Sequence, residues 1–250
     1  DDWSHPQKIE TQVKYFKENP EKIGICTHWI RAKHNLMFTQ NWRPNNSLTH
    51  WSQSSFMFKR KVFEELGGWD KVRIGGDTEF IWRVKAKYGR NSFAQIAGHI
   101  PLAIALDDES SLTRTKMTHV RTVYFGLRHI YREICARWHR TNSELNIDGV
   151  VSRTSMPIPK AMVSRDGVPT NIDVLLVSDF SDDEISLPIY EFLDSPTAEN
   201  LKVGFFHWPD FTTIPGRLTE KYFNFIASGA ITPVVYVSYT LLTLPANSIA

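Results

Sequence analysis

The chain has 250 residues, 42% hydrophobic and 22% charged, a composition typical of globular proteins with one large domain or two small ones. A formal net charge of +2 is too balanced to indicate a nucleic-acid-binding protein, and no apolar run approaches the length of a transmembrane helix. The two cysteines, Cys26 and Cys135, show neither a disulfide framework nor a metal-binding spacing, which favours a reducing compartment. The chain opens on Asp1-Asp2-Trp3 without a signal peptide, and we expect a cytoplasmic fragment of a longer protein.

Helices and strands alternate through the first hundred residues. Residues 5–19 predict a helix that packs on a sheet through one face, which contains Ile9, Val13 and Phe16 with Gln12 as a further candidate. Residues 60–66 predict a second, short helix. The expected strands of this part are residues 23–32, 35–41, 54–58, 92–96 and 102–106.

The stretch 67–83, GGWDKVRIGGDTEFIWR, combines carboxylates with flexible glycine pairs just where a new helix should begin. Asp77 is predicted to be the N-cap or a first-turn residue of a helix that continues to about Tyr88. Glu79 faces away from Asp77 around this helix, and Arg83 lies one turn beyond Glu79 and can pair with it. On these residues alone, the simpler interpretation of Asp77 is a helix cap.

Residues 117–139 show the clearest helical period of the chain, with a basic face opposite the apolar one. A solvated surface is the common explanation of such a face, although it could also contact phosphates or acidic lipid. Its basic residues are not interleaved with exposed aromatic residues, so nucleic acid is not expected as a partner. Residues 141–170 lack periodicity and contain several prolines, which predicts a linker.

From residue 171 onward the pattern is that of a doubly wound α/β domain. Strands are expected at residues 172–177, 202–207 and 232–237, with helices at 186–193 and 216–227 between them. The first of these runs, IDVLLV, has the form of a buried parallel strand. No GxGxxG is present, so no dinucleotide is implied, and three strands alone would leave a sheet edge unpaired.

Four segments together resemble the second half of a family 2 glycosyltransferase with the GT-A fold, in residues, order and spacing. They are DDWSHP at 1–6, SSFMFKR at 54–60, GGWD at 67–70 and GDTEF at 76–80. The resemblance covers residues 1 to about 140. A second and weaker resemblance, through VLLVSDF at 174–180 and KVGFFH at 202–207, is to the start of the GT-B-like domain that follows the transferase in some bacterial polysaccharide enzymes.

The resemblance implies a divalent cation, Mg²⁺ or Mn²⁺, on the diphosphate of the sugar donor. Asp1 and Asp2 resemble the last two positions of the family's Asp-x-Asp-Asp signature, whose first Asp is absent here. In other GT-A enzymes a late His joins the metal, and His139 is the candidate, although a surface His is the commoner case. Without the resemblance, a terminal Asp-Asp would be a solvated charge pair.

The resemblance assigns Asp77 the role of general base, which removes the proton of the acceptor hydroxyl in an inverting transfer. Asp77 should then face the metal site across a cleft. On the acceptor side, the resemblance implies that Trp69 is a platform for a sugar ring and that Asp70 accepts a hydrogen bond from a sugar hydroxyl. Glu79 and Arg83 are expected to contribute to acceptor binding and to hold the start of the helix in place. A buried Trp beside a turn Asp is an equally good interpretation of Trp69 and Asp70.

The sequence therefore predicts an α/β protein with three parts. These are a partial GT-A domain at residues 1–140, a linker at 141–170, and an incomplete doubly wound, Rossmann-like domain at 171–250. The expected function is metal-dependent transfer of a sugar from a nucleotide-sugar to a glycan hydroxyl in bacterial surface polysaccharide synthesis. Because the donor-binding half is missing, the isolated chain is expected to be almost inactive. Peripheral contact with the inner membrane is a further expectation, and the alternative function is a non-catalytic glycan-binding or scaffolding module.

Overall fold

The computed structural model describes residues 2–39, 47–109, 118–124, 126–148, 156–164, 171–210 and 216–234. These residues form a mixed α/β structure with several sheets and helices. The chain divides into two compact units, unit 1 with residues 1–116 and 137–151 and unit 2 with residues 117–136 and 152–250. None of the described helices is both long enough and apolar enough to span a bilayer.

Unit 1 contains two small sheets. The first has the order β1-β8-β3-β4, with β5 also paired to β3, and its strands are β1 (Trp3–Ser4), β3 (His28–Ala32), β4 (Phe38–Thr39), β5 (His50–Trp51) and β8 (Pro101–Leu106). The second has the order β6-β2-β7 and consists of β2 (Gly24–Cys26), β6 (Met57–Phe58) and β7 (Phe93–Gln95). Strands β2 and β7 are parallel, as are β3 and β8.

The single strand expected at residues 23–32 is two strands in different sheets. Thr27, between them, is buried, and its backbone is bonded outside any strand ladder. Its N–H donates to Ser55 Oγ at 2.8 Å, and its carbonyl accepts from the Ser52 N–H at 2.8 Å. These bonds come from a 3-10 turn at Gln53–Ser55, which occupies the first part of the strand predicted at 54–58.

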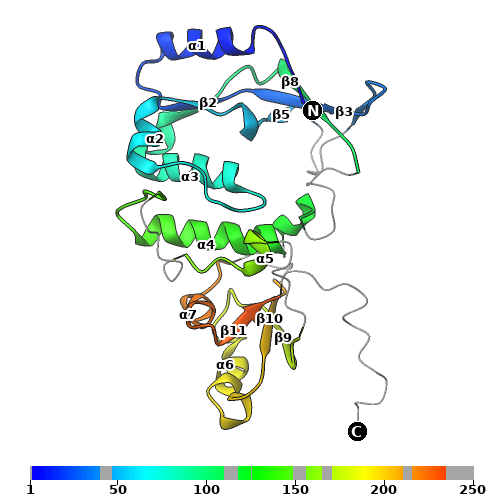
Figure 1. Ribbon diagram of the computed structural model, residues 1–250, viewed down its shortest axis with the longest axis vertical. Coiled ribbons are helices and arrows are strands. Elements are labelled where there is room, and N and C mark those ends of the chain that lie inside the picture. The colour runs from blue at the N-terminus through cyan, green and yellow to red at the C-terminus, as the bar shows by residue number, and fades with distance from the viewer. Residues whose placement is uncertain are drawn as a thin grey trace. The chain divides into compact units, whose positions relative to one another are not determined.

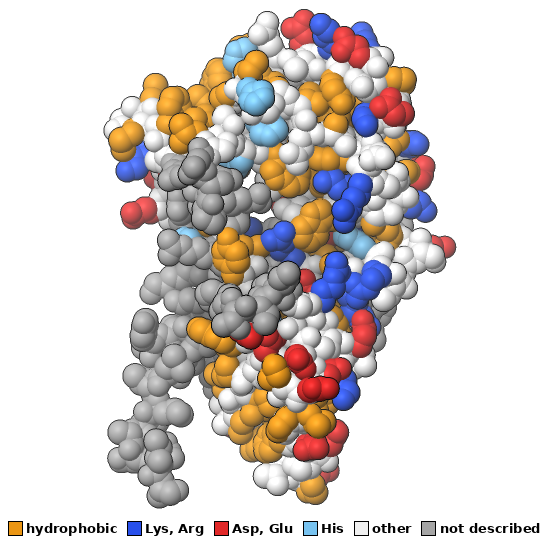
Figure 2. Space-filling view, turned by 180° about the vertical axis from the view of Figure 1, so that it is seen from behind, with side chains coloured by type: hydrophobic (Ala, Val, Ile, Leu, Met, Phe, Trp, Pro, Cys, Tyr) orange, Lys and Arg blue, Asp and Glu red, His pale blue; other side chains and the backbone are white. Residues whose placement is uncertain are grey.

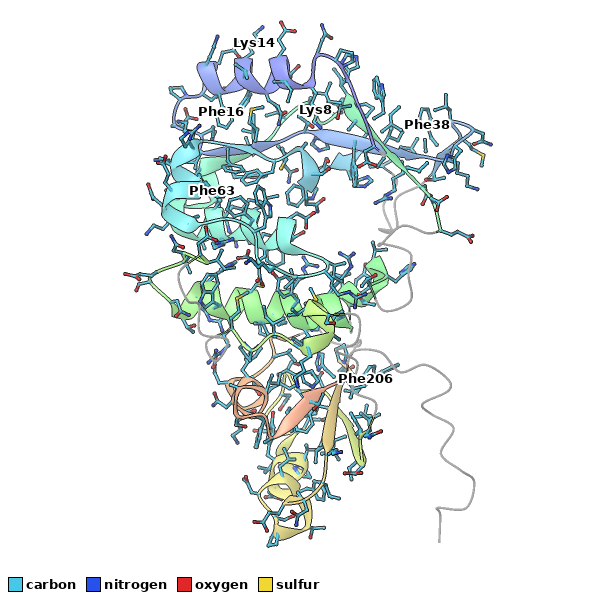
Figure 3. All side chains as sticks on the ribbon, viewed as in Figure 1. Lys8, Lys14, Phe16, Phe38, Phe63 and Phe206 are labelled. Carbon is cyan, nitrogen blue, oxygen red and sulfur yellow. The ribbon has the colours of Figure 1, made fainter. Side chains whose placement is uncertain are left out.

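Helix α1 (Lys8–Glu18) confirms the first predicted helix, but the expected packing face is wrong for two of its residues. Ile9 and Val13 are exposed, whereas Gln12 is buried and donates from Nε2 to the Ser55 carbonyl at 2.7 Å. Figure 3 shows Phe16 on the side of α1 that faces the strands. The helix therefore packs through a polar contact of Gln12, the polar candidate for this face.

Helices α2 (Arg60–Leu66) and α3 (Gly76–Tyr88) agree with the predicted positions. Figure 1 shows α1 on one side of the strands of unit 1 and α2 with α3 on the other. Both α2 and α3 end at a glycine with positive φ, Gly67 at +72° and Gly89 at +84°. Under the second sheet an aromatic cluster joins Phe56, Phe58 and Phe80, with ring centroids 5.0–5.7 Å apart.

The helix expected at residues 117–139 is a 3-10 turn, Val120–Val123, followed by α4 (Leu127–Thr141). Gly126 lies between the two, where a residue without a side chain favours a break. The predicted apolar face of α4 is confirmed, since Leu127, Ile130, Tyr131, Ile134, Cys135 and Trp138 are all buried. Within the range expected as a linker, the short helix α5 (Lys160–Val163) and Leu145 contribute buried side chains.

Unit 2 contains a parallel sheet with the order β11-β10-β9, as the alternating pattern predicts. Its elements are β9 (Val174–Ser178), α6 (Leu187–Leu193), β10 (Val203–His207), α7 (Glu220–Ser228) and β11 (Ile231–Pro233), with a 3-10 turn at Pro196–Ala198. Strand β10 is buried throughout, whereas β9 alternates, with Leu175 and Val177 exposed. The expectation that the first strand is buried is thus wrong, because successive side chains of β9 point to opposite faces and the face of Leu175 and Val177 is exposed.

Candidate active site around Asp77

Asp77 lies in the first turn of α3 with its carboxylate exposed to solvent. The preceding Gly75 is the N-cap residue and has a φ of +80°, a conformation that glycine adopts without strain. Asp77 Oδ1 accepts the Thr78 backbone N–H at 2.7 Å. Its second oxygen has no hydrogen-bond partner among the described residues. Of the two predicted placements, the first-turn position is confirmed.

The charge of Asp77 acts on the carboxyl end of β2, where Cys26 is the last residue. Burial raises the pKa of the Cys26 thiol to about 12, and the negative charge of Asp77 adds to this rise against the opposite effects of Ser55 and Lys85. The carboxyl ends of parallel strands are where open α/β sheets bind ligands. Strands β2 and β7 are parallel, so their carboxyl ends lie at the same edge of the second sheet.

Behind Asp77, a buried polar network fixes the first turns of α3. Arg83 Nε lies 2.9 Å from Glu79 Oε1 as an ion pair, and Arg83 Nη2 donates to Glu79 Oε2 at 3.1 Å. His139 Nε2 is also 2.9 Å from Glu79 Oε1, so one carboxylate is bound by two nitrogen groups. The predicted pairing of Glu79 with Arg83 is confirmed. Since both side chains are at most 1% exposed, neither presents a surface to an acceptor, contrary to that part of the expectation.

Arg83 extends the network to the glycine turn that follows α2. Its Nη1 and Nη2 atoms donate to the carbonyls of Leu66 and Gly68, both at 2.6 Å. The Gly68 N–H donates in turn to Asp148 Oδ2 at 3.0 Å. The turn and the start of α3 are therefore held by the same buried guanidinium, which pairs with Glu79 and binds the last carbonyl of α2 at Leu66.

Trp69 and Asp70 follow this turn and have different environments. Trp69 is 49% exposed, and its ring packs on Phe58 and Phe80 at centroid distances of 6.0 and 4.9 Å. It thus presents a supported aromatic surface to solvent. Asp70 is buried, and its carbonyl accepts the Val72 N–H at 2.8 Å. The structure therefore leaves Trp69 accessible to a ligand and encloses Asp70.

The residues expected to hold a metal have other partners where the structure describes them. Asp1 lies outside the described residues. Asp2 is exposed, and its Oδ1 accepts the Leu106 N–H at 3.2 Å, at the end of the strand that pairs with β1. His139 is engaged by Glu79 instead. Within the described ranges no three His, Cys, Asp or Glu side chains are grouped so that they could hold a metal ion.

A second cluster of titratable groups, in unit 2, was not predicted. His207, the last residue of β10, stacks on His129 with ring centroids 5.3 Å apart and an interplanar angle of 12°. Asp179 directly follows β9, and its Oδ1 lies 3.8 Å from His207 Nδ1. Burial lowers the pKa of both imidazoles, that of His207 to about 4. The available signal was the placement of Asp179 and His207 at the ends of adjacent parallel strands.

The chain matches no known protein-family model, and no characterised protein resembles it to a significant degree. Its function therefore has to be inferred from the side chains and geometry described above.

Proposed function

We propose that the chain is the acceptor-side part of an inverting glycosyltransferase of the GT-A type, in which Asp77 is the catalytic base. The observation that supports this proposal most is the contrast along the first turn of α3. Asp77 is exposed and one of its oxygens has no partner among the described residues, whereas Glu79, two residues later, is buried and bound by Arg83 and His139. The buried network supplies the rigid support that a base needs, and Asp77 remains free to meet a substrate.

In the proposed reaction the acceptor oxygen attacks the anomeric carbon of a nucleotide-sugar. A bond from this oxygen to the anomeric carbon forms as the bond to the nucleoside diphosphate breaks, and the hydroxyl proton passes to Asp77. An alcohol is a poor nucleophile until a positioned base takes its proton, and such a base contributes roughly 10²–10⁴-fold to the rate. The accessible oxygen of Asp77 is suited to this task because no other described group occupies it.

Two further residues fit this reaction. The exposed face of Trp69, backed by Phe58 and Phe80, would support the apolar face of an acceptor sugar. Asp2 is exposed, and in the described part of the chain its carboxylate accepts one hydrogen bond, which leaves oxygen lone pairs for Mg²⁺ or Mn²⁺. When bound, such an ion would neutralise the diphosphate of the donor. His139 is better suited to position Glu79 than to bind this metal.

Unit 2 has the β-α-β-α-β order and parallel pairing expected of the first part of a Rossmann-like domain, and we propose this identity for it. An alternative function for unit 1 is non-catalytic glycan binding, which the exposed Trp69 platform would also serve. Metal-dependent binding of a nucleoside diphosphate would favour the transferase over the binding module.

The test is Asp77→Asn in a protein that contains this chain with any residues that precede Asp1. We expect turnover of the nucleotide-sugar to fall by about 10²–10⁴-fold, with donor binding retained, because the amide cannot accept the proton. Glu64→Gln is the matched control, since Glu64 is an exposed carboxylate on α2 and should not affect turnover. Turnover retained in Asp77→Asn would remove Asp77 from the mechanism.

A further inference from the structure

His129 and His207 form a contact inside unit 2, between the first turn of α4 and the carboxyl end of β10. Their rings are stacked, with centroids 5.3 Å apart and an interplanar angle of 12°. Two neutral rings attract each other in this arrangement, whereas two imidazolium ions at the same separation would repel. The contact therefore holds the start of α4 on β10 only while the pair is not doubly charged.

The hydrogen bond of His207 requires its neutral form. His207 Nδ1 accepts the Phe180 N–H at 3.2 Å, so the single proton of the neutral ring is on Nε2. A second proton would have to bind Nδ1, where it would face the N–H of Phe180. Asp179 provides another partner for that proton, since its Oδ1 lies 3.8 Å from Nδ1. His207 thus has two arrangements available, a neutral one bound by Phe180 and a protonated one paired with Asp179.

His129 is likewise placed for its neutral form. Its Nε2 is buried and has no hydrogen-bond partner among the described residues. The first turn of α4 also disfavours an imidazolium, because the amino end of a helix is its positive end. Burial lowers the pKa of His129 against the charge of Glu133 and the backbone of Val123, which both favour protonation. Of the remaining charges that act on it, Arg132 opposes protonation and Asp179 favours it.

The surroundings of the pair attract protons. Residues 179–199 are rich in Asp and Glu and contain no Lys or Arg. Figure 2 shows acidic side chains gathered on the lower part of the molecule. A surface of this sign raises the local concentration of protons. Burial and then the charge of His129 lower the pKa of His207, and Asp179 acts in the opposite direction.

We propose that the stacked pair is an acid-operated latch, which holds the start of α4 on β10 while the rings are neutral and releases it when they take up protons. In the released state the His207 imidazolium pairs with Asp179, and repulsion moves His129 and the first turn of α4 away from β10. The sheet β11-β10-β9 stays folded, because backbone groups and not the imidazoles pair its strands. Release is reversible when the pH rises, and the proposal is independent of the role of Asp77.

The test is a pH titration of the full chain by NMR. Imidazole signals follow the protonation of His207, and hydrogen exchange of two backbone N–H groups follows release. The Phe180 N–H reports its bond to His207, and the Ile130 N–H, which donates to the Gly126 carbonyl at 3.1 Å, reports the first turn of α4. Between pH 6.5 and 4, both should exchange roughly tenfold faster or more, after correction for the intrinsic effect of pH, and in step with protonation. The N–H groups inside β10 should stay protected.

Two variants separate the charge of the pair from its shape. His129→Phe keeps a ring stacked on His207 but cannot be charged, and an aromatic face attracts a cation. His207 should then titrate at a higher pH than in wild type, while the Ile130 N–H remains protected. Asp179→Asn removes the partner of the imidazolium and should move both protonation and release to lower pH. His99→Phe, at an exposed position of unit 1, is the matched control and should change neither.

Three results would overturn the proposal. The first is exchange of the Phe180 and Ile130 N–H groups that does not follow the protonation of His207. The second is loss of protection in β10 together with Ile130, which would mean that unit 2 unfolds as a whole and has no latch. The third is release of Ile130 in His129→Phe at the same pH as in wild type. The first two results need only the wild-type protein, so they decide the matter even if a variant does not fold.

Discussion

Acidification should destabilise unit 2 because the folded state buries the stacked imidazoles of His129 and His207 and favours their neutral forms. His207 is only 3% exposed, and burial first, then the charge of His129, lower its pKa from 6.5 to about 4. A histidine whose pKa is lower in the folded state stabilises the fold fully above the unfolded value of 6.5. That contribution is lost as the pH falls from 6.5 towards 4. At about 1.4 kcal/mol per pH unit, this single group accounts for about 3 kcal/mol.

The measurement is the free energy of unfolding of unit 2 from urea titrations, followed by hydrogen exchange of β10, above pH 6.5 and near pH 4. His207→Asn keeps an acceptor for the Phe180 N–H, which His207 Nδ1 binds at 3.2 Å, but cannot take up a proton. This variant should lose about 3 kcal/mol less than wild type over the same pH range. An identical pH dependence in both proteins would refute the assignment of the acid sensitivity to His207.

Substitutions at Arg83, Glu79, Gly67 and Gly89 in unit 1 test the buried support behind Asp77 and the glycine positions next to it. Arg83→Met should reduce the free energy of unfolding by about 3–5 kcal/mol in chemical denaturation, because Glu79 is left charged and buried without its main partner. The double variant with Glu79→Met should recover much of this loss, and additive losses would contradict the proposed pairing. Gly67→Ala should destabilise the protein by more than about 1 kcal/mol, since its φ is +72° and a Cβ atom would lie 2.7 Å from Asp148 Oδ2. Gly89→Ala is the control, because Gly89 has a φ of +84° but open space around it, so the added Cβ causes backbone strain without a clash. It should lower the stability measured by thermal unfolding less than Gly67→Ala does. Equal losses of stability would show that the clash with Asp148 does not contribute.

Local signals were sufficient for the elements with a strong helical period or clear glycine stops. Helices α2 and α3 and the parallel order of β9, β10 and β11 follow from the sequence because short-range preferences and the alternation of elements specify them. For α1 the same reasoning included Gln12 as a candidate for the packing face, but it was wrong for Ile9 and Val13, which are exposed. Hydrophobic periodicity does not show which member of a face is buried, because this depends on distant partners such as the Ser55 carbonyl that Gln12 binds 43 positions away.

The candidate site shows the same division. The sequence by itself determined that Asp77 begins a glycine-flanked helix and that Glu79 and Arg83 lie one turn apart, because helical geometry fixes residues three or four positions apart. Only the tertiary structure decided that His139 joins Glu79 and that the carbonyls of Leu66 and Gly68 surround Arg83. These contacts join groups separated by 15 to 60 positions, and the position of such partners depends on how the helices pack.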